Sequence, residues 1–576
     1  MKHVTTAALL LGLTRGEYAT NSTCKYIPGD LGWPSSKTWA RLNQTVEGRL
    51  IKTVPQASIC HTEPYHDLDE TGCEQLRENW DYAQTFELKP AEIINPAFQN
   101  QSCDPYTPLD RPCELGNYAV YSINVTGAPD IVAGLNFARD NNVRLVIKNT
   151  GHDYMGKSTG LGSLSLWTHN LKSTDVLPKY ESDHYTGPAV KIGAGVIAGE
   201  LYAAVADQGY RAVGGTCPSV GIAGGYTAGG GHSVLSGAYG LAADNVLEWE
   251  LVTANGEHII ATPTNEHSDL YWAMSGGGGG VWGVVLSVTS KIYPDGKVTG
   301  GQLAFNATEG DPEGYWKAIE SWFAFMPNYT DGLGGGNTCE YEIFYNQFNA
   351  ISFTVPDKDS TALDELLAPY IKILEGLNIT YTYSSHTSDT FYQHFDRDFG
   401  PLPYGPFPAN TLFSNRLFPR EVVEDTAKNL ALVNTIRNYT EFQDGYWWLG
   451  CESLRVNSTS HPDNSLHPAW REVIGICTVE GYWNWTIPRS EMYDRKRHMV
   501  TEIIPSIEAV TPGSGSYLNE VDSWYLGDWK DNFYGINYPR LLDVKGKYDP
   551  GHLFYAYTGV GSDYYTTDGS GRLCKA

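Results

Sequence analysis

The sequence predicts an α+β fold, and three observations lead to that prediction. Short β-branched runs alternate with single helices and glycine clusters over residues 117–295. Long amphipathic stretches alternate with aromatic, strand-like runs over residues 297–515. A chain of 576 residues with 41% apolar and 18% charged residues has the composition of a globular protein, so several units of roughly 100 to 200 residues are expected.

The first unit, residues 116–296, contains the clearest elements. Residues 143–147 (VRLVI) and 189–192 predict buried strands, and residues 199–208 predict a helix. Residues 245–253 (NVLEWELVT) predict a strand that ends in an Ala-Asn-Gly turn. We find no internal repeat with a period of about 20 to 50 residues.

The sequence patterns in the remaining units are weaker, and they predict fewer helices and strands. In the second unit, residues 297–515, the stretches 365–377 and 421–437 predict amphipathic helices. The tail, residues 516–576, contains a helix candidate at 538–548 that is followed by Asp-Pro-Gly. Residues 20–115 are rich in Pro, Cys and Trp with little periodicity, which predicts an irregular region held by disulfides.

The N-terminus and the glycosylation acceptors predict a secreted protein. Residues 1–19 have the charged start and short apolar run of a signal peptide, and a frayed N-terminal helix is the alternative. The run is too short to cross a bilayer, and no other apolar run reaches about 18 residues. N-x-[ST] acceptors are spread over the whole chain at Asn21, Asn43, Asn100, Asn124, Asn306, Asn328, Asn378, Asn438, Asn457 and Asn484.

The number of cysteines and the net charge argue against some classes of protein. The chain has ten cysteines, five of them before residue 115, without C-x-x-C or paired-His spacing, which favours disulfides over zinc. A formal charge of −26 argues against a generic binder of nucleic acids or anionic membranes. Sixteen Trp, 38 Tyr and 18 Phe are typical of secreted enzymes that hold carbohydrates or cofactors.

Two glycine motifs are weighed and set aside. Residues 151–158 (GHDYMGKS) match the phosphate-loop pattern, but the next residues are poor helix formers and no Asp-Glu strand follows to hold Mg²⁺. Residues 193–198 (GAGVIA) match the dinucleotide pattern, yet the acid expected about 20 residues later is missing. Glycines of a tight strand-to-helix turn are the simpler interpretation of this second motif.

A third glycine-rich stretch is more informative. Glycines are dense over residues 214–231 and again over 276–280, while apolar residues such as Val220, Ile222 and Leu235 lie between them. Because each glycine costs about 1 kcal/mol of ordering relative to alanine, this density predicts close approach of the backbone to a ligand. We infer a large, flat, anionic ligand held by backbone N–H groups, with a flexible linker as the alternative.

These residues resemble a known family. Residues 149–154 (NTGHDY), 215–225 (GTCPSVGIAGG), 239–246 (YGLAADNV) and 269–274 (DLYWAM) are similar to the FAD domain of the vanillyl-alcohol-oxidase superfamily. The tail motif 532–541 (NFYGINYPRL) with 547–550 (KYDP) resembles the berberine-bridge-enzyme-like branch. Residues 24–28 and 48–55 are similar to secreted fungal proteins described as isoamyl-alcohol-oxidase-like.

The resemblance implies a two-subdomain PCMH-type FAD domain and an α/β substrate domain with an antiparallel sheet. It also implies that FAD is attached twice, through His152 to its 8α-methyl group and through Cys217 to C6. A loop histidine and a disulfide cysteine are the alternatives for these residues; without Cys217, nine cysteines allow up to four disulfides. The cofactor-binding residues implied are His152, Cys217, Asn149, Thr150, Gly151, Asp153, Tyr154, Gly215, Thr216, Gly221, Ile222, Gly224, Gly225, Asp244, Asn245, Val246 and Asn537.

The general base is less clear than the cofactor site. The run 470–485 resembles the substrate-domain strand that covers the flavin, and strand alternation places Ile474, Ile476, Thr478 and Glu480 on one face. Glu480 is the first candidate for the base, with a solvated surface Glu as the alternative. Tyr538, which could instead be a core tyrosine, and Asp522 follow as second and third candidates.

The family resemblance implies an oxidase that transfers hydride from an alcohol to flavin and is reoxidised by O₂ to give H₂O₂. The substrate could be a small alcohol, a sugar or a secondary-metabolite hydroxyl. One alternative is a tailoring enzyme that couples or cyclises a metabolite, and another is an inactive flavin-fold protein that binds glycans. The expected partners are a small-molecule substrate and O₂, with no nucleic acid, no membrane and a monomeric state.

Overall fold

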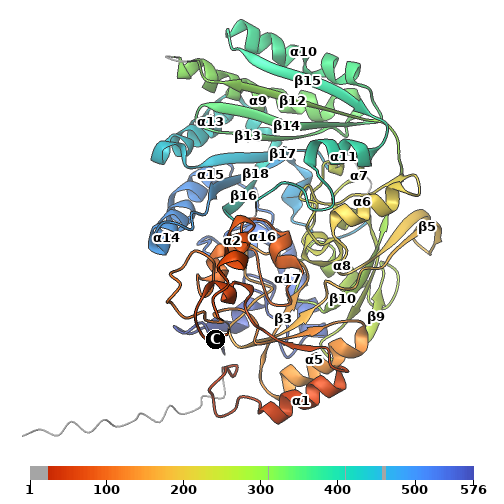
Figure 1. The fold of residues 1–576 in the computed structure, drawn as a ribbon. Helices are drawn as coiled ribbons and strands as arrows, with labels where there is room; N and C mark the ends of the chain where they lie inside the picture. The colour runs from red at the N-terminus through yellow and green to blue at the C-terminus, as the bar shows by residue number, and fades with distance from the viewer. Residues whose placement is uncertain (1–23, 66, 309–310, 409, 457–461) are drawn as a thin grey trace, which may run out of the picture.

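The computed structural model describes residues 24–65, 67–308, 311–408, 410–456 and 462–576 (Figure 1). The expected signal peptide and the acceptors Asn21 and Asn457 lie outside the described residues. The described chain forms three larger sheets and two small ones. In Figure 1 the largest sheet occupies the upper half of the molecule and the other two larger sheets the lower half.

A four-stranded sheet begins the lower half, with strand order β1-β2-β4-β3. Strands β2 (Tyr121–Asn124), β4 (Ser163–Trp167) and β3 (Arg144–Lys148) are parallel, and β1 (Leu50–Lys52) is antiparallel to β2. Helix α5 (Ala128–Asp140) connects β2 to β3 and buries one face on the sheet. Gly134 permits this packing, because a Cβ there would lie 2.5 Å from Leu166. Residues 143–147 were predicted as a strand, and β3 confirms the prediction.

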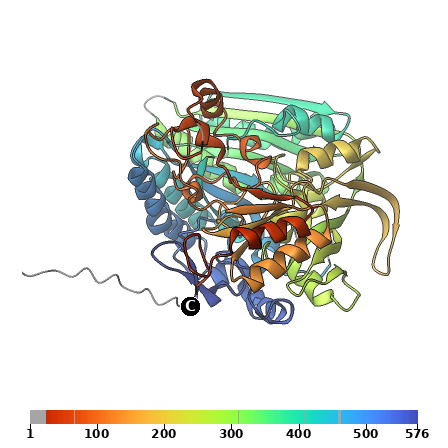
Figure 2. The same ribbon diagram turned by 60° about the horizontal axis from the view of Figure 1, so that its bottom comes forward.

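A five-stranded antiparallel sheet lies beside it, with strand order β5-β6-β10-β8-β9. Its strands are β5 (Thr174–Glu181), β6 (Thr186–Gly193), β10 (Val284–Lys291), β8 (Val246–Val252) and β9 (His258–Ala261). Strands β6 and β8 confirm the predicted strands at 189–192 and 245–253, and the Ala-Asn-Gly turn joins β8 to β9. Helix α6 (Ala198–Ala206) confirms the predicted helix at 199–208. The β5–β6 hairpin projects at the right of Figure 2.

The seven-stranded antiparallel sheet has the order β15-β12-β14-β13-β17-β18-β16. The strands are β12 (Val298–Asn306), β13 (Thr338–Ile343), β14 (Gln347–Pro356), β15 (Tyr381–Ser388), β16 (Thr411–Pro419), β17 (Trp448–Ser453) and β18 (Val473–Tyr482). Neighbouring residues of β12 face opposite sides of the sheet. Gly301 faces Leu363 of α10 (Ser360–Gly376), whereas Gly300 faces Asp398 of α11 (Phe391–Phe399). The two helices therefore cover opposite faces.

The other helices and strands complete these layers. The predicted stretch 365–377 coincides with the second part of α10, which ends one residue earlier at Gly376. The stretch 421–437 forms two helices, α12 (Arg420–Glu424) and α13 (Thr426–Thr440), separated at Asp425. Asp425 ends α12 and caps α13 by accepting hydrogen bonds from the N–H groups of Ala427 and Lys428. The remaining elements are α1 (Ser36–Thr45), α2 (Glu70–Glu78), α3 (Gln84–Glu87), α4 (Pro96–Gln99), α7 (Ser236–Tyr239), α8 (Ser268–Met274), α9 (Pro312–Asp331), α14 (Arg489–His498), α15 (Ile504–Val510), α16 (Trp529–Tyr534), β7 (Tyr210–Arg211), β11 (Tyr293–Pro294), β19 (Tyr565–Thr567) and β20 (Leu573–Lys575).

The tail packs on the lower half of the molecule. Helix α17 (Tyr538–Tyr548) matches the predicted helix at 538–548 and contacts α8. The guanidinium of Arg540 lies 3.7 Å from the ring centroid of Trp272 in α8, a cation–π contact. The buried ammonium of Lys545 donates to the carbonyl of Val281 at 2.7 Å. A disulfide joins Cys24 to Cys574, so both ends of the described chain lie together.

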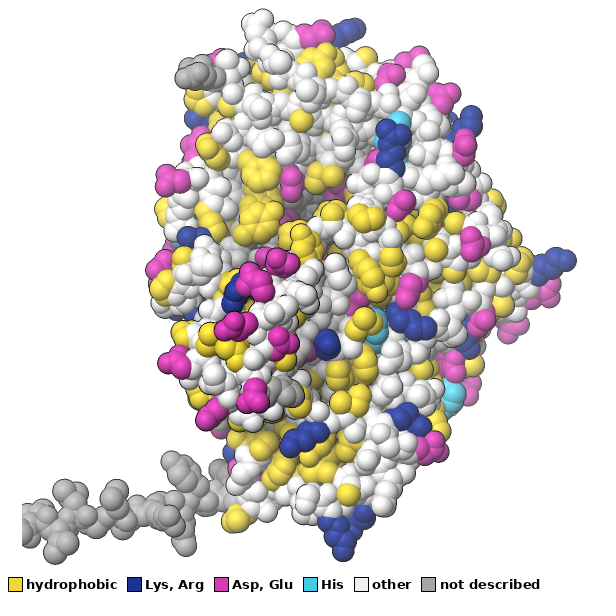
Figure 3. Space-filling model, in the orientation of Figure 1, with side chains coloured by type: hydrophobic (Ala, Val, Ile, Leu, Met, Phe, Trp, Pro, Cys, Tyr) yellow, Lys and Arg dark blue, Asp and Glu magenta, His cyan; other side chains and the backbone are white. Residues whose placement is uncertain are grey.

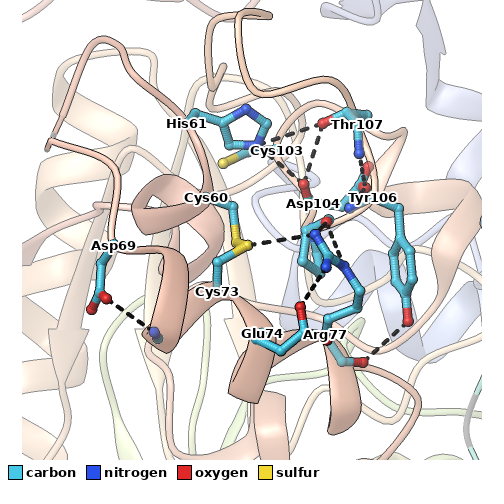
Figure 4. The surroundings of a disulfide bond; sticks show 12 residues. Cys60, His61, Asp69, Cys73, Glu74, Arg77, Cys103, Asp104, Tyr106 and Thr107 are labelled. Atoms are coloured by element: carbon cyan, nitrogen blue, oxygen red, sulfur yellow. Dashed lines mark hydrogen bonds and ion pairs between the residues drawn. A yellow bond between two sulfur atoms is a disulfide. The ribbon is translucent and has the colours of Figure 1, made fainter.

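Two short disulfides hold residues 60–113, and part of this segment packs on the upper half. Cys60 pairs with Cys73, and Cys103 pairs with Cys113. Beside the first bond, Arg77 donates to the carbonyl of Pro105 at 2.9 Å and pairs with Glu74 at 2.7 Å (Figure 4). Buried Trp80 and Phe86 belong to the same apolar cluster as the core of the seven-stranded sheet. A fourth disulfide, Cys451–Cys477, joins β17 to β18.

All eight described glycosylation acceptors are at least partly exposed to solvent. The described acceptors Asn306, Asn328, Asn378, Asn438 and Asn484 are exposed, and Asn43, Asn100 and Asn124 are half-buried. In Figure 3, Asp and Glu side chains spread over the visible face, with Lys and Arg scattered among them. Within the described residues, no helix combines the length and the apolar character needed to cross a membrane.

Candidate active site

A cavity of about 430 Å³ lies between the two halves of the molecule. Its lower wall consists of the glycine-rich loops around residues 149–158, 215–228 and 279–283, and its upper wall consists of strands β13, β17, β18 and β16. The predicted cofactor residues that line this cavity are Asn149, Thr150, Gly151, His152, Asp153, Tyr154, Gly215, Thr216, Cys217, Gly221, Gly224 and Gly225. Segments far apart in sequence thus share one wall.

Glycines let these loops approach one another closely. A Cβ at Gly221 would lie 2.6 Å from the Asn149 side chain, and a Cβ at Gly279 would lie 2.8 Å from the Cα of Gly225. At Gly225 a Cβ would meet no atom within 4 Å, so this glycine borders open space. Close backbone packing beside an open volume is the cradle that a flat ligand bound by main-chain groups requires.

His152 and Cys217 meet at a single serine. The Ser219 hydroxyl lies 2.7 Å from His152 Nε2 and 3.4 Å from Cys217 Sγ. Burial, with a smaller effect of Lys148, lowers the pKa of His152 to about 4, so its imidazole is neutral at physiological pH. Burial raises the pKa of the Cys217 thiol to about 11 in spite of its hydrogen bonds with Ser219. Cys217 is not in a disulfide.

A buried ionisable pair supports this wall from behind. Glu87, at the end of α3, places Oε1 at 3.7 Å from His152 Nε2. Burial raises the pKa of Glu87 to about 8, although Lys148 opposes the shift. Burial lowers the pKa of Lys148 to about 7, and its ammonium donates at 3.3 to 3.5 Å to the carbonyls of Phe86, Glu87, Asn149 and Thr150. The irregular early residues therefore contribute to the site, which no sequence pattern indicated.

The upper wall carries an acidic cluster around one histidine. His232 pairs with Glu452 of β17 and, at 3.1 Å, with Glu520. Burial alone would lower the pKa of His232, but the two carboxylates outweigh it and raise that pKa well above its usual value. Glu340 of β13 accepts a hydrogen bond from Thr216 at 2.9 Å. These residues lie on separate strands and loops, so no contiguous sequence motif indicates that they form a cluster.

Glu480 lies in this upper wall. It lines the cavity from β18, and Gly450 of β17 leaves the space that its carboxylate occupies. Burial raises the pKa of Glu480 well above its usual value, and the charges of Glu342 and Glu520 add to the effect. Of the residues predicted on its face, Ile476 and Thr478 also line the cavity.

Ile474 was predicted on the same face as Glu480, and this is wrong. Its side chain belongs to the apolar core of the upper half together with Cys477 and Val479. The register between β18 and β16 shifts near this residue, since Phe418 pairs with Gly475 whereas Pro419 pairs with Val473. Strict alternation along a strand does not survive such a shift.

Two other candidate bases lie outside the residues that line the cavity. The Tyr538 hydroxyl accepts the N–H of Gly561 at 3.3 Å and donates to Asp563 at 3.4 Å. Asp522 forms a buried ion pair with Lys496 and accepts the N–H of Trp524 at 2.7 Å. Both side chains have structural partners in this arrangement.

Five predicted cofactor residues also lie outside the lining. Asp244 accepts from the Arg471 guanidinium at 2.7 Å, and Asn245 donates to the carbonyl of Leu241 at 2.9 Å. The Asn537 amide donates to the carbonyl of Leu466 at 2.9 Å. Ile222 is buried in the apolar core, and Val246 begins strand β8 in the same core. These side chains hold the surrounding loops and strands.

Aromatic rings and carboxylates dominate the upper half of the cavity. Tyr154 stacks on Phe413 with ring centroids 4.7 Å apart, and the rings of Trp448 and Tyr482 lie 4.7 Å apart. Among the described residues that line the cavity, Lys157 is the single Lys or Arg. The acidic lining consists of Asp153, Glu340, Glu342, Glu452, Glu480 and Glu520. The upper wall thus offers apolar rings and carboxyl groups and few cationic side chains to a ligand.

Comparison with known proteins places this geometry in a family. An FAD binding domain model matches residues 121–262, and a model described as berberine and berberine like matches residues 516–561. The chain is 50% identical over 555 residues to bifunctional decalin synthase calF of Penicillium decumbens, covering 96% of each chain. It is 47% identical over 580 residues to VAO-type flavoprotein oxidase VAO615 of Thermothelomyces thermophilus, covering 100% of this chain and 99% of the relative.

Solved structures of related proteins have the same fold as this chain. The crystal structure of VAO-type flavoprotein MtVAO615 from Myceliophthora thermophila C1 has a TM-score of 0.93 at 48% identity, covering 96% of this chain and 100% of that one. A glucooligosaccharide oxidase from Acremonium strictum with 6-S-cysteinyl, 8α-N1-histidyl FAD shares the fold, with a TM-score of 0.62, 19% identity and coverage of 77% and 92%. The glycine cradle fits FAD, and this chain belongs to the berberine-bridge-enzyme-like FAD-linked oxidoreductases of the VAO-type flavoprotein family.

Proposed function

We propose that this chain is a secreted oxidase that removes hydride from an alcohol and passes it to a doubly attached FAD. In this proposal O₂ takes up the electrons and H₂O₂ is released. The observation that carries the proposal is that His152, Cys217 and Glu480 line one cavity. Two attachment residues and a carboxylate with a raised pKa are the groups that such a reaction needs.

His152 and Cys217 are proposed to hold the flavin covalently. The contacts of both side chains with Ser219 support this, because they put the two groups on the same small area of wall. A neutral imidazole has the free electron pair that bond formation requires. Glu87, 3.7 Å from His152 Nε2, is proposed to receive the proton that the ring releases when it bonds. Because Glu87 accepts a proton only when it is ionised and its pKa is about 8, attachment should be faster at alkaline pH than at neutral pH. The flavin linkage of the Acremonium strictum oxidase uses the same two residue types.

Glu480 is proposed to be the general base. Bound flavin would supply the hydride acceptor, while this carboxylate removes the proton from the substrate hydroxyl. Its raised pKa matches the task, because a carboxylate with a higher pKa accepts a proton more strongly than an ordinary surface Glu. Since the carboxyl must be ionised to act, turnover should rise with pH as Glu480 loses its proton.

The substrate is proposed to be a neutral, partly apolar alcohol. The rings of Phe413, Trp448 and Tyr482 support this, and among the described lining residues Lys157 is the single Lys or Arg that could pair with an anionic substrate. The 50% identity to a bifunctional decalin synthase favours a second candidate, in which the same site drives oxidative cyclisation of a metabolite.

Secretion, glycosylation and domain roles belong to the same proposal. Four disulfides and five exposed acceptor asparagines support an extracellular location. We assign FAD binding to residues 116–296, with support from 516–576. Residues 297–515 are assigned to substrate binding, and 20–115 to a disulfide-held region that supports the flavin attachment. The protein is expected to act as a monomer.

The attachment is tested by acid precipitation of the purified protein. Yellow colour should stay in the pellet of the wild type and of His152→Ala and Cys217→Ala, and should leave the pellet of the double variant. Cys339→Ala is the matched control, because this second free cysteine is buried and does not line the cavity. Flavin released from acid-treated wild type would refute covalent attachment.

The reaction is tested with a panel of neutral alcohols, sugars and polyketide alcohols under O₂. Oxidation of an alcohol should give equal amounts of carbonyl product and H₂O₂. A cyclised product that forms without carbonyl formation would favour the second candidate. Anionic hydroxy acids serve as the control, and faster turnover on them than on neutral alcohols would contradict the proposed substrate class.

A further inference from the structure

Three ligand-type side chains meet outside the flavin cavity, at the inner face of the seven-stranded sheet. His386 lies in β15, and His394 and Asp398 lie four residues apart on α11. One donor atom from each residue lies within 4.8 Å of the others. Asp398 carboxylate oxygens are 3.3 Å from His386 Nε2 and 3.5 Å from His394 Nδ1. Residues four apart share one helix face, so both α11 side chains point at β15.

The three side chains are withdrawn from solvent. The exposed fractions are 0% for His394, 3% for Asp398 and 12% for His386. His394 Nδ1 and His386 Nε2 are buried and make no hydrogen bond, although the carboxylate lies near both. A bound ion is one arrangement that would satisfy both ring nitrogens and the carboxylate at once.

Neighbouring hydroxyl groups orient the cluster. His394 Nε2 lies 2.9 Å from Thr354 Oγ1, so a proton on Nε2 leaves the electron pair of Nδ1 facing Asp398. Ser352 donates to Asp398 Oδ2 at 2.7 Å. At Gly300 a Cβ would lie 2.6 Å from both Asp398 Oδ2 and His386 Nε2, so this glycine keeps the space clear. Second contacts of this kind accompany metal ligands in proteins.

We propose that His386, His394 and Asp398 bind a zinc ion that joins α11 to the edge of the seven-stranded sheet. Zinc binds imidazole nitrogen and carboxylate oxygen at about 2.0 to 2.2 Å in tetrahedral geometry, which separates ligand atoms by roughly 3.4 Å. The separations of 3.3 Å from Asp398 Oδ1 to His386 and of 3.5 Å from Asp398 Oδ2 to His394 are close to that value. Calcium and magnesium prefer oxygen ligands, so two imidazoles disfavour them. A water molecule completes the coordination beside the partly exposed His386.

The segment that follows α11 connects the proposed zinc site to the flavin cavity. This helix ends at Phe399, and Phe407 and Pro408 line the cavity eight and nine residues later. Between them, Gly405 packs against Pro218, the residue after the proposed attachment cysteine. Zinc thus fixes the starting point of a segment that closes one side of the flavin site, without taking part in the chemistry.

Metal content tests the site directly. The flavin-loaded full chain is dialysed against a chelator and then against zinc sulfate, passed over a desalting column and measured for zinc. Wild type should retain about one zinc per chain, and His386→Gln and His394→Ala should retain none. His258→Ala is the matched control, because His258 is an exposed histidine on β9. Wild type without retained zinc, or equal zinc in all four proteins, would overturn the proposal.

Two further readouts keep the test decisive if His394→Ala does not fold. Ser352→Ala removes only the hydroxyl that orients Asp398, and should weaken zinc binding by about 10 to 100-fold while flavin stays bound. Crystals grown with zinc should show anomalous scattering at the zinc edge between His386, His394 and Asp398. Anomalous density elsewhere, or unchanged zinc affinity in Ser352→Ala, would contradict this site.

Discussion

The two walls of the cavity are built on different principles. The lower wall uses backbone from consecutive stretches, such as residues 149–154 and 215–225, with glycines that bring one loop against another. The upper wall uses single side chains, such as Glu340, Glu452 and Glu480, each from a different strand of one sheet. The first wall can hold one cofactor in a fixed way, and the second can vary with substrate while the fold stays unchanged.

Breaking the lower wall should remove the cofactor on which activity depends. Gly279→Ala puts a methyl group 2.8 Å from the Cα of Gly225, so the two loops must separate. We expect the fraction of chains that carry flavin to fall at least about tenfold, because the steric overlap disturbs the cradle before the covalent bonds can form. Flavin absorbance per protein measures it. Gly376→Ala in α10 is the control, since its added methyl meets no atom within 4 Å. Full occupancy in Gly279→Ala would mean that this close approach is not needed.

Breaking the upper wall should spare the cofactor. Glu480→Gln keeps the shape of the side chain and removes its ability to accept a proton. We expect kcat to fall by about 10² to 10⁴-fold with flavin still attached, and its rise with pH to disappear. Steady-state H₂O₂ release across pH measures both effects. The exposed Glu375→Gln is the control. Wild-type kcat in Glu480→Gln would assign the base to another residue of the upper wall.

Glu87, which lies behind the lower wall, should make the stability of the folded chain depend on pH. The folded chain holds the Glu87 proton up to about pH 8, whereas an ordinary Glu releases it near 4.5. The folded state therefore binds more protons than the unfolded state in this window, and stability falls as pH rises through it. Glu87→Gln should lose less melting temperature than wild type between pH 5 and pH 8. An equal loss in the two proteins would show that Glu87 is ionised in the folded chain.

The smallest effect is expected at Tyr538, outside both walls. Tyr538→Phe removes hydrogen bonds of 3.3 and 3.4 Å to Gly561 and Asp563. Thermal unfolding should show a loss of about 0.5 to 1.5 kcal/mol, and kcat should stay within about twofold of wild type. A much larger fall in kcat would make Tyr538, and not Glu480, the proton acceptor.

The two walls differ in how far the sequence predicts them, because one is built from contiguous segments and the other from residues far apart in the chain. Residues 143–147, 199–208 and 538–548 carry their periodicity locally, and the corresponding β3, α6 and α17 agree with it. The glycine-rich loops are contiguous, so their closeness to a ligand can be read directly. Glu87 and His232 were missed because their partners, His152 and Glu452, lie 65 and 220 residues away. Ile474 was misplaced because a register shift depends on the neighbouring strand.

The bond between Cys24 and Cys574 turns most of the chain into a covalent ring. A protease that cuts one exposed loop inside this ring leaves a single molecule of unchanged mass apart from one added water. The nicked protein would migrate as one species without reductant and as two fragments with it. The same closure places the two ends where a short linker could join them, so new termini could be opened at a surface loop such as the turn at residues 254–256.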